Sequence, residues 1–227
     1  MERHFDHALG ELREKLLTMG GLVEKAIELA THALQTRDLA KAGQVQEIEK
    51  KVNESHISVD DTCLKLLALQ QPLAADLRLI VAVIKMNTDL ERMGDQAVNI
   101  AHNTSRYLKG EPLKPLVDLP VMFNEVRFMV REALDSFVKR DEKLARDVLN
   151  RDDRVDSLKN KIFRDVIEHV KTRPECVEQG LNLILIARNL ERLGDHATNI
   201  AEDVIFAITG EDVRHSARPE AIKHALS

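Results

Sequence analysis

The chain has 227 residues, enough for one large domain or two domains of about 110 residues each. Its residues are 44% hydrophobic, 31% charged and 3% aromatic, a composition typical of long helices with aliphatic cores. A net charge of −5 argues against nucleic acid as a partner, and the longest apolar runs fall far short of the roughly 20 residues that span a membrane. Two unmatched cysteines and an N-terminus without an apolar core favour a cytoplasmic protein without disulfides or membrane insertion.

Helical periodicity runs through most of the chain, and prolines and glycines divide it. The predicted helices span residues 5–36, 38–69, 72–109, 117–140, 142–172 and 175–209. Asp38 and Asp141 stand where an aspartate side chain caps the first turn of a helix. Gly110 and Gly210 each follow an amphipathic run, as residues past a helix C-terminus often do. Short connections imply antiparallel neighbours, so the predicted fold class is all-α, two three-helix bundles in tandem.

The predicted domain boundaries follow from the same punctuation. We place an N-terminal bundle at 1–110, a proline-rich linker at 111–120, a C-terminal bundle at 121–212 whose first helix starts near 117, and a tail at 213–227. Two glycines in the first helix, Gly20 and Gly21, predict a local kink.

An internal repeat links the two predicted bundles. The stretch DLERMGDQAVNIA at 89–101 returns 100 residues later as NLERLGDHATNIA, with nine of thirteen positions identical. Each copy holds two acids one helical turn apart, Glu91 with Asp95 and Glu191 with Asp195. Since such a pair is self-repulsive, an opposite charge is expected to offset it in both copies.

The helical period predicts where these acids point. At 100° per residue, Leu90, Met93 and Ala97 share one face of the third helix, which therefore faces the bundle core. The acids lie roughly 140° from that face, so we expect them on the surface. Gly94 and Gly194 lie nearer the core, where a missing side chain lets another helix approach closely.

A second pair of polar residues recurs on the second helix of each bundle, at an offset of 103 residues. EKKVN carries Glu49 and Asn53, and DDRVD carries Asp152 and Asp156. Adjacent helices thus predict one oxygen-rich cluster per bundle, which suits magnesium, manganese, calcium or ferric iron better than zinc. The candidate metal ligands are Glu49, Asn53, Glu91, Asp95, Asp152, Asp156, Glu191 and Asp195.

An alternative interpretation needs no metal. Arg92 and Arg192 stand three residues before Asp95 and Asp195, and ion pairs at that spacing form ordinary solvated charge faces. His196 has no counterpart in the repeat, which favours a surface or packing role over ligation.

Together with the segment LALQQPLAADLRLI, the ERMGDQAVNIA and ERLGDHATNIA blocks and the EKKVN and DDRVD pairs resemble the PhoU family of phosphate-transport regulators. The resemblance runs from about residue 5 to about residue 210. It implies a cytoplasmic, non-enzymatic negative regulator of the phosphate-starvation response. Such a regulator links the ATPase subunit of an ABC phosphate transporter to a sensor histidine kinase, and a homodimer is expected. It also implies surface metal sites of iron, manganese or magnesium at the ligands named above.

One position departs from the family pattern. Asn53 stands where the family motif has an acid, so the first bundle offers a cation one fewer negative charge than the second. We therefore predict that the second bundle binds metal more tightly.

Two rival functions remain open. One is a metal-free helical scaffold with a solvated charge face. The other is a carboxylate-bridged dinuclear enzyme, which typically needs inward Glu-xx-His pairs that this chain lacks. With a metal bound, a cluster can bridge to carboxylates or phosphate on a partner. Without one, the same acids can pair with a partner's Arg and Lys.

Overall fold

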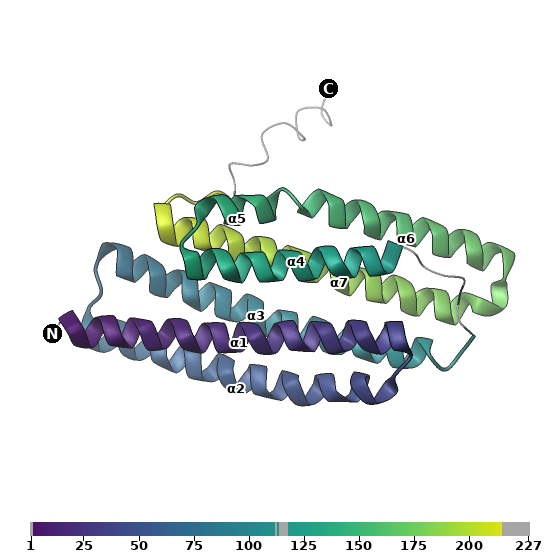
Figure 1. Cartoon of the computed structure of the whole chain (residues 1–227), viewed down its shortest axis with the longest axis horizontal. Helices are drawn as coiled ribbons and strands as arrows, with labels where there is room; N and C mark the ends of the chain where they lie inside the picture. Colours follow the sequence, from purple (N-terminus) through teal and green to yellow (C-terminus); the bar gives the residue numbers. More distant parts are fainter. Residues whose placement is uncertain (1, 112, 114–117, 215–227) are drawn as a thin grey trace, which may run out of the picture.

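The computed structural model describes residues 2–111, 113 and 118–214. The first bundle contains α1 (Glu2–Thr36), α2 (Leu39–Gln70) and α3 (Ala74–Tyr107). The second contains α4 (Asp118–Lys139), α5 (Glu142–Leu149), α6 (Asp152–Thr172), the 3-10 turn η1 (Pro174–Cys176) and α7 (Val177–Thr209). No strand occurs among the described residues, and the two bundles lie against each other along their length (Figure 1). The predicted all-α fold of two tandem three-helix bundles is confirmed.

Three of the four predicted punctuation residues mark helix ends as expected, whereas α3 ends at Tyr107 with Leu108 as its cap, so that Gly110 lies beyond the cap. The carboxylate of Asp38 accepts the backbone N–H of Ala40 at 2.9 Å, and that of Asp141 accepts the N–H of Leu144 at 3.1 Å. Both aspartates thus cap the helices that follow them. Gly210 ends α7 with a φ of 79°, in the left-handed region that glycine enters without strain.

The second helix of the second bundle differs from the prediction. A single helix is predicted over 142–172, whereas the structure is interrupted between α5 and α6. At the interruption, Arg151 donates to Glu125 of α4 at 2.6 Å, and its guanidinium lies 4.0 Å from the Phe128 ring centroid. The Glu125 carboxylate is buried, and a buried charge is costly unless it is paired. The interruption thus coincides with a contact to α4, which lies 26 residues earlier in the sequence and is not part of the helical pattern.

The third helices bury the face that the periodicity predicts. Leu90, Met93 and Ala97 are fully buried. A Cβ added at Gly94 would lie 3.2 Å from Val52 Cγ1 of α2, and the equivalent glycine of α7 packs on α6 in the same way. The predicted close helix packing is therefore confirmed. It occurs within each bundle, so these glycines are not available to a dimer surface.

Gly20 has a different role from the predicted kink. α1 is helical without interruption through Gly20 and Gly21. A Cβ at Gly20 would lie 2.8 Å from Leu134 Cδ1 of α4, while one at Gly21 would have no atom within 4 Å. Gly20 thus allows close contact between the two bundles.

The two bundles join mainly where α3 packs antiparallel on α7, an interface that we call the seam (Figure 1). In the seam, His196 Nδ1 lies 2.8 Å from Asp89 Oδ1, and the Asn199 amide donates to the same oxygen at 3.1 Å. Further along, the fully buried Asp203 of α7 lies 3.5 Å from Lys85 Nζ of α3. The seam is therefore held by charged groups as well as by apolar packing.

The ends of the predicted linker and tail are partly described. α4 begins at Asp118, so Pro120 lies in its first turn, where proline is tolerated. Residues 112 and 114–117 of the linker and 215–227 of the tail lie outside the described residues. The start of the predicted tail packs on α7, because Arg214 donates to Asp203 at 2.5 Å.

The packing at Gly94 leads to a stability prediction. We expect Gly94→Leu to lower the free energy of unfolding by about 1 to 3 kcal/mol, because the new side chain collides with Val52. Gly21→Leu is the matched control, since its site is open and leucine favours helix. Urea denaturation of both variants measures the difference. Equal stability of the two would contradict the packing assigned to Gly94.

The buried aspartate of the seam leads to a pH prediction. Burial raises the pKa of Asp203 from its ordinary value of 3.8 to about 6, although Arg214 and Lys85 oppose the rise. The fold therefore favours the protonated form, and this stabilisation is complete below about 3.8 and lost as the pH rises through 6. An asparagine at this position cannot ionise. The free energy of unfolding of Asp203→Asn, compared with that of the parent chain, should therefore rise by about 3 kcal/mol as the pH goes from about 4 to about 7. Chemical denaturation at both pH values tests this, and a pH-independent difference would refute it.

Candidate metal-binding clusters

The first cluster consists of Glu49 and Asn53 on α2 with Glu91 and Asp95 on α3. Asp95 is exposed and Glu91 partly buried, so these acids lie on the surface side of α3 as predicted. The Asn53 amide nitrogen donates to Glu49 Oε1 at 2.5 Å. The Asn53 Oδ1 atom is buried and has no hydrogen-bond partner among the described residues. An unpartnered amide oxygen one helical turn from the Glu49 carboxylate is a donor that a hard cation can use.

The second cluster consists of Asp152 and Asp156 on α6 with Glu191 and Asp195 on α7. Lys159, one turn beyond Asp156, places its Nζ 2.8 Å from Asp156 Oδ1 and 2.7 Å from Glu191 Oε1. The Lys159 side chain is 25% exposed, so this contact is partly shielded from water. Carboxylates from two helices therefore already share one cation.

Partial burial and, second to it, mutual repulsion raise carboxyl pKa values in the second cluster. Burial is the main cause that raises the pKa of Asp195 to about 6, and the charge of Glu191 acts in the same direction. Burial also raises the pKa of Asp152, reinforced by the charge of Asp156. Burial lowers the pKa of Lys159, but its bonds to Asp156 and Glu191 outweigh that effect and the net shift is upward. The cluster thus favours a cation among its carboxylates.

The ordinary charge face predicted as an alternative does not form through the arginines. Neither Arg92 nor Arg192 makes an ion pair with any side chain in the described part of the chain. In the second cluster Lys159 supplies the opposite charge instead. Repeat analysis missed Lys159 because the residue at the matching offset of 103 is His56, which has a different charge and lies near Asp60.

His196 has the packing role that the sequence favours. The sequence repeat does not reveal its partner across the seam, Asp89, because the equivalent residue of the second copy is the uncharged Asn189. The contact between Asp89 and His196 has no counterpart in the other copy of the repeat, so comparing the two copies does not point to it.

The donor set fits a hard cation in its chemistry. All the candidate ligands offer oxygen, and Lys159 shows that carboxylates of α6 and α7 lie close enough to share a positive charge. Among the residues that the structure describes, no three His, Cys, Asp or Glu side chains already surround one ion position. Ligand assignment therefore stays a prediction, with the same eight residues as candidates.

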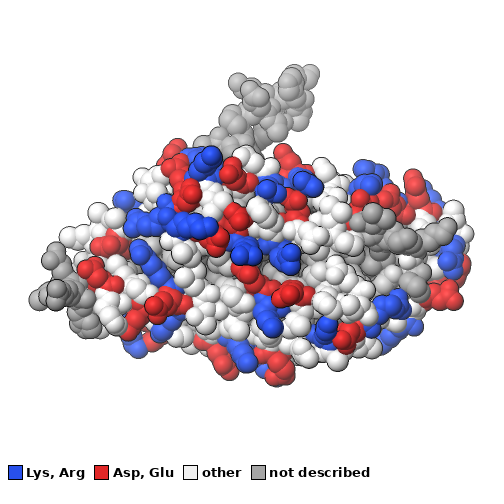
Figure 2. All heavy atoms as spheres, in the orientation of Figure 1, with Lys and Arg blue, Asp and Glu red and all other residues white. Residues whose placement is uncertain are grey.

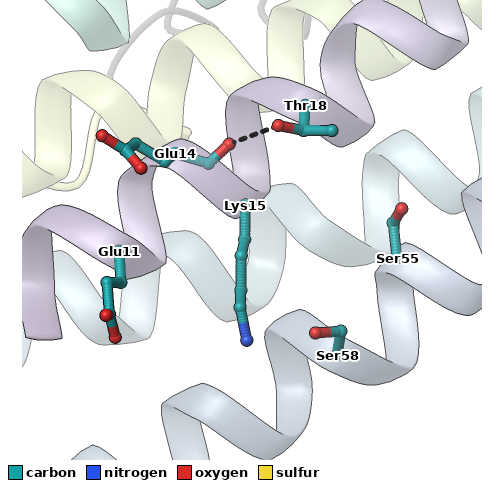
Figure 3. Close-up of a pocket in the computed structure, with 6 residues that line it drawn as sticks. All are labelled: Glu11, Glu14, Lys15, Thr18, Ser55 and Ser58. Carbon is teal, nitrogen blue, oxygen red and sulfur yellow. Dashed lines mark hydrogen bonds between the residues drawn. The ribbon is translucent and has the colours of Figure 1, made fainter.

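A separate hollow of about 530 Å³ lies between α1 and α2 of the first bundle (Figure 3). Its lining residues are Glu11, Glu14, Lys15, Thr18, Ser55 and Ser58. Lys15 extends from α1 toward α2 and donates to Thr62 at 2.8 Å. None of the candidate metal ligands lines this hollow.

Positive and negative side chains are interspersed over the face shown in Figure 2, without a broad basic area. Within the described part of the chain, no helix combines the length and apolar character needed to cross a membrane.

Comparison with known proteins places these features in a family. The model of the PhoU domain matches twice, at residues 16–104 and 119–204. The phosphate-specific transport system accessory protein PhoU homolog of Pseudomonas aeruginosa is 39% identical over 216 residues, covering 95% of this chain and 89% of the relative. The homolog of Aquifex aeolicus is 36% identical over 207 residues, covering 91% and 94%.

Solved structures agree with this relationship. The crystal structure of PhoU from Pseudomonas aeruginosa is similar with a TM-score of 0.88 at 39% identity, covering 91% of this chain and 100% of that one. The crystal structure of the phosphate transport system regulatory protein PhoU from Streptococcus pneumoniae gives a TM-score of 0.86 at 29% identity, covering 92% and 99%. Since the domain match takes in both repeats and the relatives align over nearly their whole length, this chain belongs to the PhoU family.

Proposed function

We propose that this chain is an accessory regulator of a phosphate-specific transport system that restrains phosphate uptake and the phosphate-starvation response when phosphate is plentiful. The observation that carries the proposal is the near full-length similarity, through both bundles, to relatives named as accessory proteins of that system. The proposed action is non-enzymatic. Its proposed partners are the transporter's ATPase subunit and a sensor histidine kinase, met in the cytoplasm, with a homodimer as the expected assembly.

Regulation of this kind is a matter of differential binding. A protein without a reaction of its own shifts a partner only if it binds one of the partner's states more tightly than the other. The two carboxylate clusters are the surfaces that we propose for this recognition, because they recur in both bundles and face outward. Charged surfaces of this type set partner choice and association rate more than they set affinity.

Metal binding at the clusters is part of the proposal. Glu49, Asn53, Glu91 and Asp95 would hold a cation in the first bundle. Asp152, Asp156, Glu191 and Asp195 would do so in the second. A bound manganese, magnesium or iron ion would supply positive charge at the surface, to which a partner's carboxylate or phosphate binds.

A second mode of recognition needs no metal. The contact of Lys159 with Asp156 and Glu191 shows that an ammonium group can join carboxylates of α6 and α7. A partner's lysine or arginine can be accepted by the same chemistry in the first cluster, where no carboxylate makes an ion pair within the described residues.

The regulatory proposal is tested by alkaline phosphatase activity in the source organism grown with ample phosphate. A strain lacking the gene should show activity raised about 5- to 150-fold, the size of change expected when a regulatory coupling of about 1 to 3 kcal/mol is lost. The wild-type gene should restore repression. Unchanged activity in the deletion strain would contradict the proposed role.

The same assay isolates the clusters. A gene carrying Glu91→Gln, Asp95→Asn, Glu191→Gln and Asp195→Asn should fail to restore repression although the protein is made at the normal level. Arg92→Gln with Arg192→Gln is the matched control, since these arginines neighbour the acids and make no ion pair within the described chain. Full repression by the acid-deficient variant would remove the clusters from the signalling role.

Metal binding is measured separately, with the purified full-length chain and Mn²⁺ as the probe. We expect Glu91→Gln with Asp95→Asn to abolish binding at the first cluster, and Glu191→Gln with Asp195→Asn to abolish it at the second, because each change removes two charged ligands. Isothermal titration calorimetry gives the stoichiometry of each variant. Stoichiometry that is the same in all of them would place the metal elsewhere.

A further inference from the structure

Lys159 changes the comparison between the two clusters. Counting acids alone, the second cluster has four carboxylates and the first has three with the neutral Asn53. Lys159 contributes one positive charge inside the second cluster, so each cluster carries a formal charge of −3. The prediction that the second bundle binds metal more tightly rests on its extra negative charge. The positive charge of Lys159 offsets that extra charge.

Among the residues that the structure describes, no lysine or arginine forms an ion pair with Glu49, Glu91 or Asp95 of the first cluster. At the offset of 103 residues that relates the two second helices, Lys159 corresponds to His56. The His56 ring contacts residues outside the cluster instead, with Nε2 at 3.4 Å from Asp60 Oδ2 and Nδ1 at 3.4 Å from the Asn87 carbonyl oxygen. The two clusters thus differ in whether a cation is already built in.

Lys159 occupies the position in which it would compete with a metal ion for carboxylate oxygens. Its Nζ lies within 2.8 Å of one carboxylate on α6 and one on α7, which is where a metal shared by the two helices would be coordinated. An ammonium and a divalent ion cannot both occupy that space, because they repel each other and need the same oxygen atoms. A metal that enters must first displace the lysine.

We propose that Lys159 is an internal counter-cation of the second cluster, which neutralises the carboxylates in the metal-free protein and must leave when a metal ion binds. This inference rests on the metal binding proposed above and adds a residue that controls it. The first cluster would then load at lower metal concentration, and the second only when the concentration is high enough to displace the lysine. Two surfaces built on one repeat would respond to different metal levels.

The test uses the full-length chain with the first cluster disabled by Glu91→Gln and Asp95→Asn, so that Mn²⁺ binding reports the second cluster alone. Adding Lys159→Met should tighten Mn²⁺ binding about tenfold or more, because the competing charge is gone. Lys159→Arg should keep the weak affinity of the parent, since the guanidinium restores a cation.

Lys161→Met is the matched control for the loss of one positive charge on α6. Lys161 is exposed and pairs with Asp118 at 2.8 Å, outside the cluster. We expect it to change Mn²⁺ affinity less than about twofold, because exposed charges outside the site are screened. An equal tightening by Lys161→Met would assign the effect to net charge and overturn the role of Lys159.

A second readout is the melting temperature. Without metal, Lys159→Met should melt at a lower temperature than Lys161→Met, because four neighbouring carboxylates lose their counter-charge. Mn²⁺ should raise the melting temperature of Lys159→Met more than that of the parent. Equal effects of Mn²⁺ on the two would count against displacement.

Failure of this inference is distinguishable from failure of the proposed metal binding. If Mn²⁺ binds the second cluster with the same affinity with and without Lys159, and Glu191→Gln abolishes the binding, the metal site stands and the counter-cation is refuted. If no variant binds Mn²⁺, both the metal site and the counter-cation are refuted, while the alkaline phosphatase test of regulation is unaffected.

Discussion

The packing of α3 on α7 is the constraint on which the arrangement of this molecule depends. Each third helix must meet its own bundle core, the second helix of its bundle and the third helix of the other bundle. Gly94 and Gly194 allow the close contact with the second helix, and polar residues such as Asp89 and His196 join the third helices. Only a narrow stripe of each third helix then remains at the surface. The acid pairs occupy that stripe, so their outward position follows from how the other faces are used.

The two bundles share the same helical framework but differ in where charged side chains make contacts. Asp89 and Lys159 make contacts that their counterparts, Asn189 and His56, do not reproduce. A buried or half-buried charge is costly unless it is paired, so each such residue fixes one specific partner. Divergence at these positions leaves the helical framework intact. It gives the seam one contact that does not recur and gives only the second cluster a built-in lysine. For a protein proposed to bind two different partners, this provides a physical means of telling them apart.

The features that could be predicted from the sequence are those that depend on residues close together in the chain. The repeat, the apolar face of α3 and the caps at Asp38 and Asp141 all follow from spacings of a few residues, and the structure confirms them. The Arg151 contact at the interruption before α6 and the Lys159 contact in the second cluster join residues 26 and 32 positions apart in sequence. Such contacts leave no periodic signal, and they do not recur in the other half.

We propose that carboxylates of neighbouring helices in each bundle form a surface site for a hard cation. Anomalous diffraction from crystals of the full-length chain soaked in Mn²⁺ tests it most directly. We expect an anomalous peak between α2 and α3 beside Glu91 and Asp95. At higher Mn²⁺ we expect a second peak between α6 and α7, with the Lys159 side chain moved away. Peaks elsewhere on the molecule, or none beside these acids at saturating Mn²⁺, would contradict it.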